Sequence, residues 1–78
     1  MNEKEVVKAA MAARGYNQAM LADAAGLKRQ SNVSEMLRGK SLRVDSFVKL
    51  MNAMGFDVIV KDRNGKNSEN QWKVDDAE

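Results

Sequence analysis

The chain has 78 residues, a formal net charge of +2, and neither cysteine nor histidine. This length allows a single domain with a thin core, to which dimerisation would add stability. The missing residue types exclude disulfides, thiolate metal sites and histidine-based catalysis, and we expect no metal or other cofactor. No apolar run approaches the roughly 20 residues of a membrane span.

The first helix is predicted over residues 3–14. Its apolar side chains recur at helical spacing, at Val6, Val7, Ala10 and Met11. Gly15 suits the left-handed conformation that ends many helices. The acids Glu3 and Glu5 lie where a signal peptide needs cations, so we expect a cytoplasmic protein.

Two shorter helices joined by a turn are predicted next. Asn17 is a good N-cap for the first of them, and Gly26 permits a positive φ at the turn. The second begins near Gln30 and ends at Gly39. Their buried sides are formed by small or apolar residues: Leu21, Ala22 and Ala25 in the first, and Val33, Met36 and Leu37 in the second.

The strongest periodic signal predicts a fourth helix over about residues 44–54. Its broad apolar face contains Val44, Phe47, Val48, Leu50, Met51 and Met54. Gly55 closes this helix, since glycine readily adopts the left-handed conformation at helix ends.

A strand and a hairpin are predicted after the fourth helix. Residues 56–62 are rich in β-branched side chains and bounded by turn formers, and residues 70–74 form a second strand. Asn64–Gly65 is a strong reverse-turn pair. A two-residue turn there would start the return strand at residues 66–68, whose composition is poor for a strand, so a loop over residues 63–69 is favoured.

Basic charge gathers around the third helix. Residues 28–43 carry five cations and one acid, whereas residues 55–78 carry four cations and six acids. A nucleic-acid surface needs such a patch, because neutralised phosphates supply most of the non-specific affinity. Taken alone, a charge run is also typical of an ordinary solvated face.

Two short helices joined by a tight turn, with a polar second helix flanked by cations, have the layout of a helix-turn-helix. Over residues 6–55 the chain also resembles the Cro/C1-type (XRE) helix-turn-helix family, which includes phage repressors and small bacterial antitoxins. The matching motifs are Asn-Gln-Ala-x-Leu-Ala from 17, Ala-Gly-Leu from 25, the Gln-Ser helix ending Arg-Gly-Lys at 40, and Ala-Met-Gly-Phe from 53. The resemblance implies a mainly α, four-helix, lambda-repressor-like fold that binds DNA in a bacterial or phage setting.

One departure from the family concerns the start of the third helix. About six residues separate the turn glycine from the buried aliphatic in the family, whereas Gly26 to Val33 makes seven steps here. The extra residue falls in the turn, and the helix then starts near Gln30. Asn32 and Glu35 also have capping-box spacing, which would shorten the helix to about two turns and leave Gln30 in the loop.

Base readout requires polar side chains at the start of the third helix that reach base edges, as glutamine, serine and asparagine do. Predicted base contacts are Gln30, Ser31, Asn32, Ser34 and Glu35. Outside a two-helix motif, the same residues would be read as polar surface positions.

Phosphate contacts are predicted on both sides of the turn. The candidates are Asn17, Gln18, Lys28, Arg29, Arg38, Lys40 and Arg43. Gln18 resembles the glutamine at the start of the family's second helix, where backbone amides and side chain bind phosphate. Asn17 has a second interpretation, as a cap and nothing more.

The strand after the fourth helix resembles that of HipB- and HigA-like antitoxins, whose members pair through it. Val58, Ile59 and Val60 would present an unpaired edge that invites a second copy, and Trp72 packs either within one subunit or across the dimer. A two-fold dimer would place two reading helices about 34 Å apart and imply a near-palindromic operator. The alternative is a monomeric hairpin whose edge is guarded by charged residues 61–63.

These inferences divide the chain into a helix-turn-helix domain (1–55), a dimerisation strand or hairpin (56–74) and an acidic tail (75–78). They predict a dimeric, sequence-specific regulator of double-stranded DNA, most simply a repressor. The alternatives are an antitoxin that binds a toxin as well as DNA, and a scaffold for protein contacts alone. An enzyme is not expected, because the sequence offers no catalytic cluster.

Overall fold

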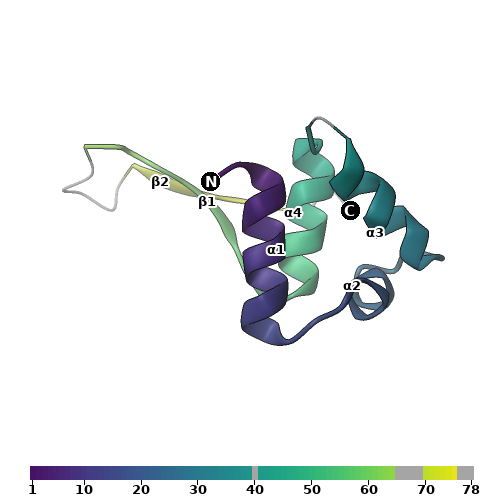
Figure 1. Cartoon of the computed structure of the whole chain (residues 1–78). Coiled ribbons are helices and arrows are strands. Elements are labelled where there is room, and N and C mark those ends of the chain that lie inside the picture. The colour runs from purple at the N-terminus through teal and green to yellow at the C-terminus, as the bar shows by residue number, and fades with distance from the viewer. Residues whose placement is uncertain (40, 65–69, 76–78) are drawn as a thin grey trace.

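The computed structural model describes residues 1–39, 41–64 and 70–75, apart from the side chain of Gln30. Four helices are followed by a two-stranded antiparallel hairpin (Figure 1). In chain order the elements are α1 (Glu3–Arg14), α2 (Gln18–Ala24), α3 (Gln30–Arg38), α4 (Val44–Ala53), β1 (Val58–Lys61) and β2 (Gln71–Val74). This confirms the predicted fold class. No helix among the described residues is long and apolar enough to cross a membrane.

Helices α1 and α4 lie side by side and run in the same direction (Figure 1). At their N-terminal ends, the Leu42 backbone N–H donates to Glu3 Oε1 at 3.2 Å. At their C-terminal ends, Arg14 Nε donates to the Met54 carbonyl at 3.0 Å. α1 ends at Gly15, whose φ of 69° is the left-handed conformation expected from the sequence.

A reciprocal capping box starts α1 where the sequence placed it. The Asn2 side chain accepts from the Glu5 backbone N–H at 2.9 Å, and the Glu5 carboxylate accepts from the Asn2 backbone N–H at 3.3 Å. Two otherwise unpaired backbone donors at the helix N-terminus are thereby satisfied. The start of α1 was predicted from periodicity alone, but the Asn-x-x-Glu spacing of residues 2–5 also indicates this capping box.

The core lies between the four helices and uses the predicted inner stripes. Its fully buried large side chains are Val7, Leu21, Val33, Val48 and Leu50. The prediction that Val44 belongs to the buried apolar face of α4 is wrong, because 71% of its surface is exposed. It lies one turn before Val48, in the first turn of α4, where none of the described residues covers it. The predicted helix ran to Met54, whereas α4 ends at Ala53 and Met54 is its C-cap residue. The Met54 side chain is buried, as predicted.

The four helices form the body of the molecule. The hairpin extends from this body beside α1, on the side opposite α2 and α3 (Figure 1). Lys61 lies opposite Gln71, whereas a two-residue turn at 64–65 would place Lys61 opposite position 68. The two-residue alternative is therefore wrong, and the longer connection is right; residues 65–69 lie outside the described part. β1 is shorter than predicted, because Phe56 and Asp57 form the connection from α4.

Candidate nucleic-acid interface

The α2–α3 unit is fixed by a cap and by a left-handed glycine. The Asn17 side chain accepts from the Met20 backbone N–H at 2.8 Å, as predicted for an N-cap. Gly26 has a φ of 73°, a conformation that side chains with a Cβ rarely adopt. α2 and α3 pack against each other across this turn.

Helix α3 starts at Gln30, the position predicted from the longer turn. Arg29 precedes it in extended conformation, with φ −139° and ψ 143°. Asn32 belongs to the first turn, because its backbone N–H donates to the Arg29 carbonyl at 3.1 Å. The alternative in which Asn32 caps a shorter helix is therefore wrong. Gln30 is inside the helix, but its side chain lies outside the described part.

One side of α3 is buried and the other faces solvent. Val33 is fully buried, while Met36 and Leu37 pack against the core at partial burial. Ser31 and Glu35 are exposed and lie one turn apart on the opposite side. Of the other predicted base contacts, Asn32 and Ser34 are partly exposed on its flanks, and the side chain of Gln30 is not among those described. The hairpin lies on the other side of the body, so it does not cover the outward face of α3 (Figure 1).

Exposed cations precede α3, lie in its last turn and follow it along the chain. The described ones are Lys28 and Arg29 in the turn, Arg38 in the last turn of α3, and Arg43 just before α4. Lys40, the remaining predicted phosphate contact of this group, lies outside the described residues. Arg38 Nη2 donates to Ser34 Oγ at 3.3 Å, which holds its guanidinium along the outward face.

A pocket of about 360 Å³ joins α3 to the start of α4. Glu35 and Arg43 both line it, together with Met36 and Leu42. The outward face of α3 and the cation before α4 therefore belong to one continuous surface. At the start of the two-helix unit, Asn17 caps α2 and Gln18 is its first residue. Asn17 is exposed and Gln18 partly buried.

Asp45 is a charged neighbour of this surface that the sequence analysis gave no role. Its carboxylate pairs with Arg43, with Nε to Oδ1 and Nη2 to Oδ2 both at 3.2 Å. The side chains are 83% and 58% exposed, so solvent screens the pair. The spacing of two residues between an arginine and an aspartate at a helix start was the available signal. Asp45 reduces the positive charge that Arg43 offers to a ligand.

The geometry is that of a helix-turn-helix unit with an open, basic outer side. A family model described as helix-turn-helix matches residues 7–59, more than half of the chain. The chain belongs to the Cro/C1-type helix-turn-helix family. Members of this family are DNA-binding regulators and are generally not enzymes. No curated protein and no solved structure gives a match to the chain.

Proposed function

We propose that this helix-turn-helix protein is a sequence-specific repressor that inserts α3 into the DNA major groove. The observation that carries the proposal is the division of α3 into a buried side around Val33 and an exposed polar side through Ser31 and Glu35. A recognition helix needs both, because one side anchors it and the other meets base edges. Occupying promoter DNA is the simplest way for such a domain to regulate.

Each predicted contact has a distinct task in this proposal. Glu35 accepts a hydrogen bond from a cytosine amino group, and Ser31 bonds base edges near the start of α3. Gln30, Asn32 and Ser34 complete the proposed base contacts. The proposed phosphate contacts are Asn17, Gln18, Lys28, Arg29, Arg38, Lys40 and Arg43, which position the helix without reading sequence.

Selection of bound duplexes from a random DNA pool tests the proposal directly. We expect one enriched motif for the wild type. Glu35→Gln should relax the base preference at one position of that motif, because the contact reads a base. Arg29→Ala should weaken binding to all sequences and lower the salt slope by about one, because the contact is to phosphate. Equal losses on selected and scrambled DNA for Glu35→Gln would remove it from the reading face.

We further propose that the regulator binds as a homodimer formed by the hairpin. Val60 and Trp72 lie opposite each other on one face of the hairpin and are 53% and 61% exposed. Ile59 on the other face is 47% exposed. Unpaired strand edges and exposed apolar side chains favour association with a second copy. Two-fold symmetry would then match two half-sites of a near-palindromic operator, about 34 Å apart.

Sedimentation equilibrium tests the dimer. Trp72→Ser should shift the protein toward monomer, because it removes the largest exposed apolar side chain of the hairpin. Gln71→Ser is the matched control, since Gln71 is an exposed polar neighbour on β2 whose loss removes no apolar surface. A wild-type protein that stays monomeric at the highest accessible concentration would exclude this interface.

The exposed apolar pair also favours a second candidate function, that of an antitoxin. In that case, the hairpin of Val60 and Trp72 would be covered by a toxin protein instead of, or in addition to, a second copy. A small toxin-like reading frame in the same operon, whose product co-purifies with the wild type but not with Trp72→Ser, would favour this function over a simple repressor.

A further inference from the structure

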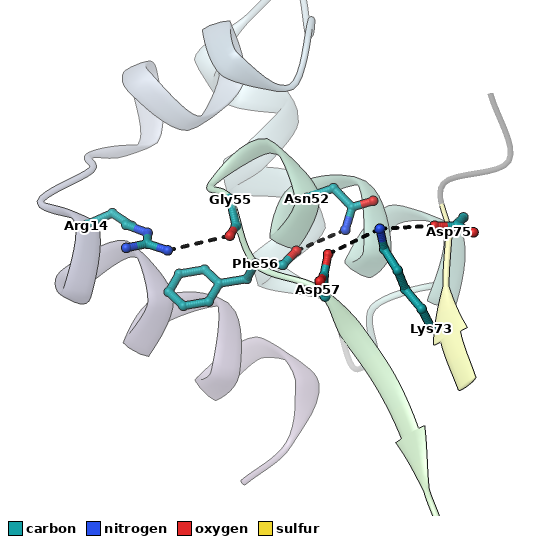
Figure 2. A network of polar contacts seen from close by, with 7 residues as sticks. All are labelled: Arg14, Asn52, Gly55, Phe56, Asp57, Lys73 and Asp75. Atoms are coloured by element: carbon teal, nitrogen blue, oxygen red, sulfur yellow. Dashed lines mark hydrogen bonds and ion pairs between the residues drawn. The ribbon is translucent and has the colours of Figure 1, made fainter. Parts of the chain in front are cut away.

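The short connection between α4 and β1 is held from two helices at once. Arg14 reaches it from the last turn of α1, and Asn52 reaches it from the last turn of α4 (Figure 2). These residues are far apart in sequence and were given no role by the sequence patterns. Both donate to backbone carbonyls, so they hold the backbone of the connection in place.

Arg14 makes three contacts at the end of α4. Its Nε donates to the Met54 carbonyl at 3.0 Å, and its Nη2 donates to the Gly55 carbonyl at 3.5 Å. Its guanidinium carbon lies 4.2 Å from the centroid of the Phe56 ring, within the range of a cation–π contact. The carbonyls at a helix C-terminus lack partners within the helix. Arg14 therefore ties α1 to the last turn of α4 and to the first residue that leaves it.

Asn52 fixes the next peptide group. Its Nδ2 donates to the Phe56 carbonyl at 3.0 Å, from the other side of the connection (Figure 2). Two residues later Val58 begins β1 and packs against the core. On the hairpin side, Lys73 of β2 pairs with Asp57 at 3.5 Å. The base of the hairpin is thus bound to the helical body before the strands separate from it.

We infer that Arg14 and Asn52 are positioning residues that set the distance between the two DNA half-sites. The inference rests on the proposed function, in which the hairpin forms the dimer and α3 reads DNA. The direction of the hairpin relative to α4 then fixes the separation of the two reading helices. With a rigid connection, affinity for paired half-sites should be high at one separation only. With a loosened connection, several separations should be bound with similar affinity.

Binding to a set of duplexes with two identical half-sites at graded separations tests this inference. The wild type should prefer one separation. In Arg14→Met, which keeps the apolar stem but loses both hydrogen bonds, the affinity ratio between the best and neighbouring separations should fall by about threefold to tenfold, the factor expected for one or two lost bonds. Affinity for a single half-site and the dimer dissociation constant should not change. Lys8→Met is the matched control, because Lys8 is an exposed cation elsewhere on α1.

Asn52→Ser provides a second, independent variant, and it decides the matter if Arg14→Met does not fold. A spacing profile that superimposes on that of the wild type in the folded variants would overturn the inference while leaving the dimeric regulator intact. A wild type that binds paired half-sites no better than one half-site would overturn the dimer, and with it the role of this connection.

Discussion

The helical body and the hairpin differ in what they bury. In the body, Leu21 and Leu50 have no exposed surface. In the hairpin, Ile59, Val60 and Trp72 are each about half exposed. The body therefore holds a core within one chain, whereas the apolar residues of the hairpin leave water fully only when another surface covers them. Stability therefore depends on residues of the body, whereas the assembly that we propose would depend on residues of the hairpin.

The largest effect expected from this difference is on the free energy of unfolding. Leu50→Ala should destabilise the chain by about 2–5 kcal/mol, because it leaves a cavity in a fully packed core. Val60→Ala should change the unfolding midpoint of dilute protein much less, since about half of its side chain is already exposed to solvent. Urea titrations at a concentration where the protein is monomeric make the comparison. Equal losses from the two substitutions would mean that the hairpin face is buried within one chain.

The same division explains how far the sequence could be interpreted. The bounds of α1 followed from periodicity and from Gly15, and the start of α3 followed from the spacing between Gly26 and Val33 compared with the family. Both glycines adopt the expected positive φ. Strand ends depend on pairing between distant segments, and β1 accordingly came out too long at both ends. The exposure of Val44 depends on which helices cover the first turn of α4, which periodicity does not encode.

Within the candidate site, the sequence identified residue types and could not identify their partners. The exposed positions Ser31 and Glu35 follow from their helical spacing to Val33. The contacts of Asp45 with Arg43, and of Arg14 with the end of α4, depend on side-chain reach between elements. Arg14 and Met54 are separated by 40 positions, so no local pattern indicates that they meet.

A smaller effect is expected from two asparagines, one in each region. Asn17→Ala should destabilise the chain by about 1 kcal/mol, because it removes the N-cap of α2. Asn70→Ala should be nearly neutral, since its bond to Asp62 at 3.2 Å joins two exposed side chains. Thermal melts of both variants beside Asn17→Ser, which restores a capping group, measure the difference. A serine variant as unstable as the alanine variant would show that the cap is not the cause.

Two aspartates offer a still finer comparison, on DNA binding. Asp45→Asn should tighten binding by about twofold to fivefold at low salt and steepen the salt dependence, because it frees Arg43 for phosphate. Asp75→Asn removes the same charge from the hairpin, where the carboxylate pairs with Lys73 at 3.6 Å, and should change DNA affinity less. Fluorescence anisotropy over a salt series measures both. If the two variants gain equally, the effect is one of net charge and not of the Arg43 pair.

The smallest effect concerns acid pH and lies in the body. Hydrogen bonds from its own backbone N–H and from that of Leu42 hold the pKa of Glu3 below its ordinary value of 4.5. Because the folded state lowers this pKa, the ionised carboxylate stabilises the fold above pH 4.5 and loses that contribution as the pH falls through the lowered pKa. Glu3→Gln should therefore melt slightly below the wild type at neutral pH, and the difference should shrink as the solution is acidified past 4.5. If the difference in melting temperature stays constant over this range, the charge of Glu3 does not help to join α1 to the segment before α4. The apolar contacts alone would then hold the body together at this point.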